Sequence, residues 1–104
     1  MSDTVSASSL VSTEADHAHT LAMLGRAFPE GVSEADYRPL LAVLYPYFSD
    51  RNLADVVSRF TGRAYGLVLN DVYGVQSTKL TADAVASIHA RLVVAGLDAW
   101  SKED

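Results

Sequence analysis

The sequence contains no cysteine among its 104 residues. Without thiols the chain forms neither disulfide bonds nor thiolate metal sites, and a reducing compartment is the simplest expectation. It also has no apolar run near the ~20 residues that a membrane-spanning helix needs. Acidic Asp3 and Glu14 lie near the N-terminus, without the basic and apolar stretches of a secretory signal. We therefore expect a cytoplasmic protein without a membrane segment.

Positive charge is also scarce in this sequence. The chain carries 8 Lys and Arg against 13 Asp and Glu, which gives a net charge of −5. Modest acidity keeps a small protein soluble and disfavours a polyanionic partner. With 104 residues, 49% of them hydrophobic, the chain suffices for one domain with a modest core.

The stretch from Asp36 to Tyr45 is the centre of the predicted fold. Its apolar residues 40–45 would cover a helix nearly all round, which predicts a helix buried among other elements. Asp36 is the expected N-cap, and Pro39 is expected in the first turn, where its missing N–H costs nothing. Pro46 should then end or kink the helix near Tyr45.

Capping residues and apolar spacing predict four further helices. They run from Ser12 or Thr13 to Phe28, from the cap Ser49 to Gly62, from Asn70 or Asp71 over a short stretch to Thr78, and from the cap Thr81 to Gly96. Residues 63–70 are expected to form a connector, because a lone strand would have no partner. Trp100 is expected to fold back onto the domain.

These elements predict an all-α fold, a small orthogonal bundle of about five helices, one of them short, around the buried central helix. Residues 1–11 are rich in Ser, Thr and Ala and are expected to be a disordered tail. Residues 12–100 should form a single helical domain, followed by a C-terminal tail over residues 101–104.

Four motifs together resemble a known family. They are Phe28-Pro29-Glu30-Gly31-Val32, Asp36-Tyr37-Arg38-Pro39-Leu40-Leu41-Ala42-Val43-Leu44, Asp71-Val72 through Lys79-Leu80-Thr81, and Val85 with Ala90-Arg91-Leu92 and Ala95-Gly96. This pattern, over about residues 20–98, is similar to an actinobacterial, mycobacterial-type family of uncharacterised proteins named domain of unknown function 3349. The resemblance implies a helical domain in an actinobacterial cytosol, and it implies no activity.

The chain departs from the family pattern at three places. Residues 45–48, Tyr-Pro-Tyr-Phe, stand where the family has basic residues after its leucine run. Leu97 stands where the family tends to have tryptophan, and the segment from Asp71 to Thr81 is one residue longer. These departures concern the end of the central helix and the C-terminal packing.

The residue types of catalytic and metal sites are present, but their spacing does not support a site. His17 and His19 are two residues apart, so on a helix they point away from each other, and we interpret them and His89 as solvated. Ser77 and Thr78, with Asp83 and His89, match a hydrolytic triad by type only. They lack a nucleophile-elbow glycine pattern, and hydroxyls beside helix starts are usually caps. We expect no enzyme activity and no metal.

Glycines 62, 66 and 74 are too widely spaced for a phosphate-binding loop, so we expect no nucleotide or other cofactor. A helix-turn-helix formed by the helix after Ser49 and the helix after Asp71 is the alternative to be weighed. Its recognition helix would offer only Tyr73, Gln76 and Lys79, and the arginines are scattered through the chain. Nucleic-acid binding is therefore the less favoured function.

Tyrosines near predicted helix ends and connectors favour a protein-interaction module. They are Tyr45, Tyr47, Tyr65 and Tyr73. Tyrosine is enriched at interfaces because it joins a large apolar ring to a polar tip. The same positions are also expected if tyrosines only close a small core. The function predicted from the sequence is a non-catalytic interaction or regulatory module, which binds an unknown protein partner or itself.

Overall fold

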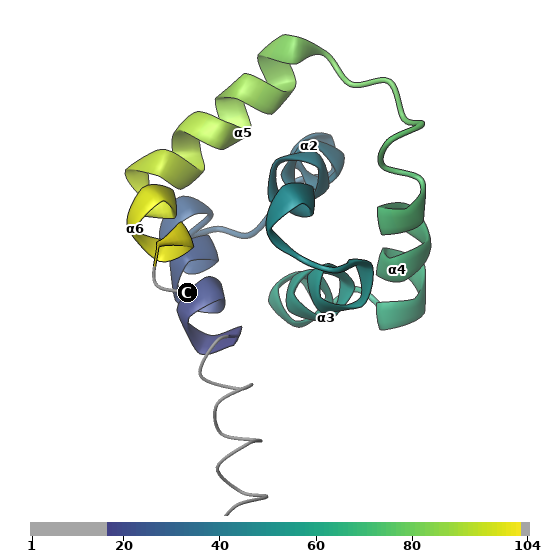
Figure 1. Ribbon diagram of the computed structural model, residues 1–104, viewed down its shortest axis with the longest axis horizontal. Coiled ribbons are helices and arrows are strands. Elements are labelled where there is room, and N and C mark those ends of the chain that lie inside the picture. The colour runs from purple at the N-terminus through teal and green to yellow at the C-terminus, as the bar shows by residue number, and fades with distance from the viewer. Residues whose placement is uncertain (1–16, 103–104) are drawn as a thin grey trace, which may run out of the picture.

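The computed structural model describes residues 17–102. In this range the chain forms the N-terminal helix (residues 17–27), α2 (Glu34–Leu44), the 3₁₀ helix η1 (Tyr45–Tyr47), α3 (Asp50–Thr61), α4 (Tyr65–Tyr73), α5 (Ala82–Val94) and α6 (Leu97–Ser101) (Figure 1). No strand occurs between residues 17 and 102, so the predicted all-α fold is confirmed. The expected tail over residues 1–11 and the expected helix start at Ser12 or Thr13 lie outside the described residues.

Helix α2 is the buried centre of the fold, as predicted. Figure 1 shows it in the middle, with α3 beneath it and α4 and α5 on its two sides. Leu40, Leu41 and Leu44 have no exposed surface. Burying a leucine completely stabilises a fold by about 1.5–3 kcal/mol relative to leaving it in water. This run of apolar residues therefore holds the surrounding helices together.

The start of α2 differs from the prediction. Ser33, not Asp36, is the N-cap, and its Oγ accepts a hydrogen bond from the Asp36 amide at 3.2 Å. The earlier start adds a turn in which the Tyr37 amide bonds the Ser33 carbonyl, and it places Tyr37 in the core. Pro39 consequently lies in the second turn, where it removes one helical hydrogen bond. Pro39 is itself buried, which offsets part of that cost. Beyond Leu44 the chain tightens into η1 around Pro46, as expected.

Helix α3 follows the sequence prediction closely. The Ser49 Oγ accepts a hydrogen bond from the Asn52 amide at 3.3 Å, and Asp50 lies in the first turn. Leu53, Val56 and Val57 are fully buried. Gly62 ends the helix with φ at 78°, in the left-handed region that glycine enters without strain.

The predicted connector over residues 63–70 is wrong, because most of this segment belongs to α4. The expected short helix from Asn70 or Asp71 is consequently misplaced, and residues 74–77 form a turn instead. Val68 and Val72 are one helical turn apart and fully buried, and α4 packs against α3. The start of α4 has no capping side chain, since Ala64 occupies the N-cap. The sequence therefore shows no start signal there.

Helix α5 begins at its predicted cap, where the Thr81 Oγ1 accepts a hydrogen bond from the Ala84 amide at 3.1 Å. Gly96, with φ at 108°, separates α5 from α6, a short helix that was not predicted. Trp100 lies in α6 and folds back as expected, because its Nε1 donates to the Thr20 Oγ1 at 3.0 Å. Ser101, assigned from sequence to the terminal tail, is the last residue of α6. Residues 103–104 lie outside the described range.

Candidate functional site

The four candidate tyrosines lie on two separate elements. Tyr45 and Tyr47 belong to η1, whereas Tyr65 and Tyr73 are the two ends of α4. Tyr45 is partly buried and packs against the core. Tyr47 is 44% exposed, and its ring meets the Trp100 ring edge-on with centroids 5.5 Å apart. The η1 pair therefore closes the core beside α6, while the α4 pair stands on an outer surface.

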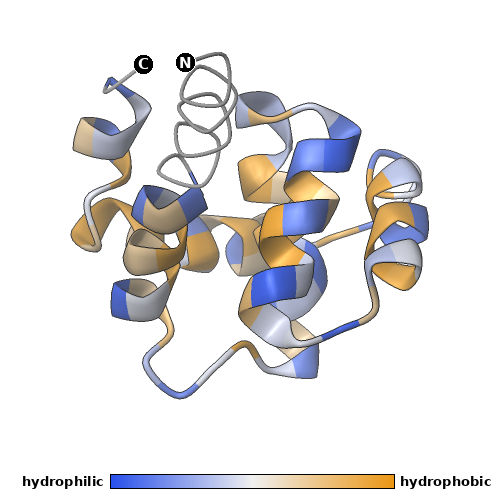
Figure 2. Cartoon of the chain, turned by 90° about the horizontal axis from the view of Figure 1, so that it is seen from below, coloured by the Kyte–Doolittle hydropathy of each residue, from blue (hydrophilic) through white to orange (hydrophobic). Residues whose placement is uncertain are grey.

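The exposed residues of α4 carry no charge, and we define the α4 outer face by them: Tyr65, Gly66, Leu67, Asn70 and Tyr73. Leu67 is 68% exposed and Tyr73 is 59% exposed, among the highest values for large hydrophobic side chains in the described residues. Figure 2 shows α4 at the right-hand edge, beside α3, which turns a blue, hydrophilic side toward the viewer. The exposed side of α3 is thus strongly hydrophilic, whereas the α4 outer face carries no charged residue.

The inner side of α4 is held to α2 by a polar network. The Tyr37 hydroxyl donates to one carboxylate oxygen of Asp71 at 2.7 Å, and Arg38 lies 3.3 Å from the other. Burial, reinforced by this hydrogen bond, raises the pKa of Tyr37 well above the ordinary tyrosine value. The hydroxyl therefore stays protonated and remains a donor to Asp71 throughout the neutral range.

Arg63 completes this network from the connection between α3 and α4. Its guanidinium carbon lies 4.0 Å from the centre of the Tyr37 ring, and its NH2 is paired with the Glu34 carboxylate in the first turn of α2. A guanidinium over an aromatic ring is attracted by the negative face of the ring. Asp71 is the only charged residue of α4, and it faces α2. Arg63, just before the helix, also faces α2. The α4 outer face therefore carries no charge from either residue.

Helices α3 and α4 are joined by three residues, 62–64, one of them a glycine. Short glycine-containing connections of this kind are typical of helix-turn-helix motifs. The second helix of the pair is α4, which begins before the position predicted from sequence, so Gln76 and Lys79 follow it. The α4 outer face carries no basic side chain. The arrangement has the shape of the motif without the charge that binds phosphate.

The structure corrects the interpretation of one histidine. His17 is only 8% exposed, and its Nε2 lies 3.5 Å from the Asp55 carboxylate of α3. It shares a helix face with Thr20 and Leu24, both buried. His19 and His89 are exposed, as predicted. Among residues 17–102, no three His, Cys, Asp or Glu side chains are grouped closely enough to hold a metal ion.

The hydroxyls that matched a hydrolytic triad by type close a turn. The Ser77 Oγ and the Thr78 Oγ1 both donate to the Gly74 carbonyl, at 3.0 and 2.8 Å. His89 lies on the exposed side of α5, and within residues 17–102 no hydrogen bond joins it to either hydroxyl or to Asp83. Ser77 and Thr78 therefore stabilise the connection between α4 and α5.

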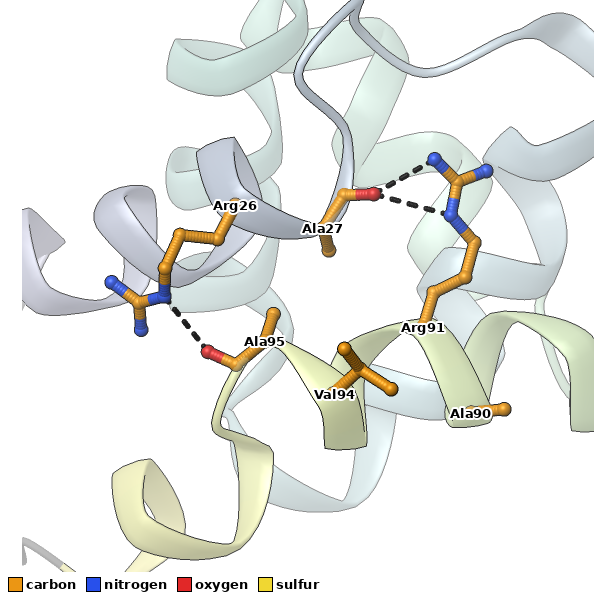
Figure 3. A pocket seen from close by; sticks show the side chains of 6 residues that line it. All are labelled: Arg26, Ala27, Ala90, Arg91, Val94 and Ala95. Carbon is orange, nitrogen blue, oxygen red and sulfur yellow. Dashed lines mark hydrogen bonds between the residues drawn. The ribbon is translucent and has the colours of Figure 1, made fainter.

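A pocket that the sequence did not indicate lies between the ends of the N-terminal helix and α5. Its volume is about 400 Å³, and it is lined by Arg26, Ala27, Ala90, Arg91, Val94 and Ala95. The Arg26 Nε donates to the Ala95 carbonyl at 2.9 Å (Figure 3). Reciprocally, the Nε and NH2 of Arg91 donate to the Ala27 carbonyl, at 3.1 and 2.7 Å. Each helix thus supplies an arginine to the carbonyl end of the other.

The hydrogen bond from an arginine to the carbonyl end of each helix is electrostatically favourable. Carbonyl groups at a helix C-terminus carry partial negative charge and lack intrahelical partners. Arg91 is held further by the Phe28 ring, 4.4 Å from its guanidinium carbon, and by the Asp36 carboxylate, 3.5 Å from its NH1. The sequence indicates only that an arginine lies near the end of each helix. It does not reveal that each arginine caps the other helix.

Comparisons of the chain with protein-family models, curated proteins and solved structures found no match. Membership of the actinobacterial family resembled by the motifs above therefore stays a prediction. No helix in the described range combines the length and apolar character needed to cross a membrane.

Proposed function

We propose that this protein is a non-catalytic interaction module that docks its α4 outer face into an apolar groove of a protein partner. The observation that carries the proposal is Leu67, which is 68% exposed on a helix whose exposed residues carry no charge and include the tyrosines at its two ends. Contiguous exposed apolar groups, tyrosine among them, are characteristic of protein interfaces. A helix with such a face is suited to binding in a hydrophobic groove.

The support beneath α4 favours this role. Asp71 on its inner side is bound by Tyr37 and Arg38 of α2, while Val68 and Val72 are fully buried. The helix is therefore held in position before any partner arrives. A preordered surface loses less conformational entropy on binding than a flexible one.

The size and charge of the face favour a groove in another protein over a second copy of this chain. Nine helical residues extend only about 13 Å, at 1.5 Å per residue. Two such faces packed together would bury far less than the ~800 Å² per partner of a stable interface. Two copies would also bring together a net charge of −5 each. A groove that encloses the helix buries more of it without that repulsion.

The cytoplasmic location and a regulatory role belong to the same proposal. The cysteine-free sequence supports a reducing compartment. A small domain with one apolar docking helix acts on its partner by occupying the partner's groove, which is a regulatory rather than a chemical effect.

The three-residue connection between α3 and α4 favours a second candidate, a helix-turn-helix nucleic-acid-binding protein. In that motif the second helix enters the major groove, and basic side chains around it contact phosphates. Here the second helix would present Leu67, Asn70 and Tyr73. The protein-interaction module is therefore the better supported function.

Site-specific photo-crosslinking tests the proposal. A benzophenone side chain is placed at Asn70, at the centre of the α4 outer face, and the full-length protein is irradiated in a native cell extract. We expect one discrete cross-linked protein, and Leu67→Asp should reduce its yield at least about fivefold, because a buried carboxylate is costly in an apolar groove. Leu67 is mostly exposed, so this substitution should change the folding stability by no more than about 0.5 kcal/mol.

The matched control carries the same photo-crosslinker at Asn52, on the exposed side of α3. Equal yields from both positions, or a yield at Asn70 that Leu67→Asp leaves unchanged, would reject α4 as the docking helix. An adduct of twice the mass of the chain would show self-association instead. A high yield of cross-linked nucleic acid that falls as the salt concentration rises would favour the second candidate.

A further inference from the structure

The pocket between the N-terminal helix and α5 is separate from the α4 outer face and plays no part in the proposed docking. Its volume of about 400 Å³ falls within the range of small-molecule sites. At ~30 Å³ per molecule it would hold about a dozen waters, or a ligand of about ten non-hydrogen atoms. Four of its six lining residues are alanine or valine, and the other two are arginine. Its lining thus combines an apolar wall with positive charge and no carboxylate.

The two arginines are not equally available to a ligand. Arg91 uses Nε and NH2 on the Ala27 carbonyl, and its NH1 lies beside the Asp36 carboxylate. Arg26 uses only its Nε, on the Ala95 carbonyl, and its two terminal nitrogens have no hydrogen-bond or ion-pair partner among residues 17–102. The Nε bond fixes the plane of the guanidinium. The terminal nitrogens then form a preset fork of the kind that binds a carboxylate through two parallel hydrogen bonds.

The apolar wall is exposed where a ligand would enter. Val94 is 89% exposed, and Figure 3 shows its side chain between the two arginines. It is among the most exposed large hydrophobic side chains in the described range, although it lies on a well-formed helix. A ligand over Val94, Ala90 and Ala27 would remove this apolar surface from water, which is favourable.

We propose that this pocket binds a small organic anion, a carboxylate joined to a short apolar body. Arg26 holds the carboxylate, the body lies on Val94 and its alanine neighbours, and Arg91 is a positioning residue that keeps the two helix ends together. The pocket is open and the ligand small, so the expected Kd is about 1–10 mM for six carbons.

The test titrates the full-length protein with hexanoate and, separately, with its neutral isostere hexanamide, and follows backbone amide shifts by NMR. Hexanoate should shift the amides around Arg26 and Val94 in a saturable way. Hexanamide should bind at least about fivefold more weakly, because it lacks the charge-assisted hydrogen bonds. Equal affinity of the two compounds, or shifts spread evenly over the protein, would overturn the proposal.

Substitutions at Val94 sharpen the test without touching any hydrogen bond of the fold, because this side chain is mostly exposed. Val94→Lys should strengthen hexanoate binding about threefold and Val94→Asp should weaken it by a similar factor, because a unit charge within the pocket attracts or repels the bound anion. If both substitutions weakened hexanoate binding to the same extent, the site would be purely apolar, and the assignment of Arg26 as the carboxylate ligand would be rejected.

Two arginine variants complete the design. Arg26→Gln should abolish the preference for hexanoate over hexanamide, and Arg26→Lys should restore part of it, because a single ammonium keeps the charge without the fork. Arg51→Gln is the matched control, since Arg51 is an exposed arginine of α3 outside the pocket. A comparable loss of hexanoate binding in Arg51→Gln would show that general charge, not the pocket, accounts for the effect.

Discussion

At the scale of single residues, Tyr37 joins more parts of the fold than its place in a leucine-rich helix suggests. It is 2% exposed, its hydroxyl binds Asp71 of α4, and its ring lies under the Arg63 guanidinium. The buried hydroxyl satisfies its hydrogen-bonding capacity through one carboxylate, which Arg38 also contacts. The α2–α4 contact therefore depends on a polar network as well as on apolar packing.

Replacing this hydroxyl should have an effect that changes with pH. Tyr37→Phe removes the hydrogen bond to Asp71 and should lower the free energy of unfolding by about 1–2 kcal/mol at pH 7. The pKa of Tyr37 is raised in the folded protein, so below pH ~10 both states keep the proton and this contribution is constant. Above pH ~10 the unfolded chain releases the proton while the folded protein retains it. The parent should then lose stability by up to about 1.4 kcal/mol per pH unit.

Urea unfolding of the parent and of Tyr37→Phe in the same buffers, from pH 7 to pH 11.5, measures this difference. The gap between the two proteins should narrow as the pH rises, because the other tyrosines and the lysines titrate equally in both. Parallel stability curves across this range would show that the hydroxyl is not protected in the folded state.

At the scale of elements, two glycines affect helix stability for different physical reasons. Gly62 ends α3 with a positive φ of 78°, a conformation that other residues adopt at a cost. Gly25 lies inside the N-terminal helix, where glycine is merely a poor helix former. An added Cβ would meet no atom within 4 Å at either position. The backbone conformation alone therefore decides the sign of a substitution.

The two glycines should respond to alanine in opposite directions. Gly62→Ala should destabilise the protein by about 1–2 kcal/mol, because alanine is strained at positive φ. Gly25→Ala should stabilise it by about 0.5–1 kcal/mol, by the difference in helix propensity. Urea denaturation with an unchanged m-value checks both. If the stability of both variants changed in the same direction, the assignment of a left-handed conformation to Gly62 or of a helical conformation to Gly25 would be wrong.

At the scale of the whole molecule, the distribution of charge disfavours nucleic-acid binding. The net charge is −5, and the helix in the recognition position presents no basic side chain on its exposed face. Three of the arginines are engaged with the protein itself. Arg91 binds the Ala27 carbonyl, Arg63 pairs with Glu34, and Arg38 pairs with Asp71.

We therefore expect duplex DNA to bind with a Kd no better than about 10 μM at physiological salt, weaker than specific sites require. Fluorescence anisotropy with labelled duplexes of several sequences, between 50 and 200 mM salt, measures this. Sub-micromolar binding that falls steeply with salt would instead favour the helix-turn-helix function over the interaction module.

The sequence by itself determined the parts of the fold that depend on neighbours along the chain. The buried character of α2, the caps Ser49 and Thr81, and the glycine after α5 were all predictable, because apolar spacing and capping act within one or two turns. The start of α2 was less predictable from the sequence, because serine and aspartate are similarly favoured as N-caps and both Ser33 and Asp36 are available.

The tertiary structure alone decided which distant residues meet. Helix α4 lacks a cap and forms because Val68 and Val72 bury against α3, a contact that no local pattern encodes. The Tyr37–Asp71 bond and the exchange between Arg26 and Arg91 join residues 34 or more positions apart, and both candidate sites arise from such contacts. Side-chain chemistry is readable in a sequence, but the partner of each side chain depends on how the helices pack, and packing is a property of the whole chain.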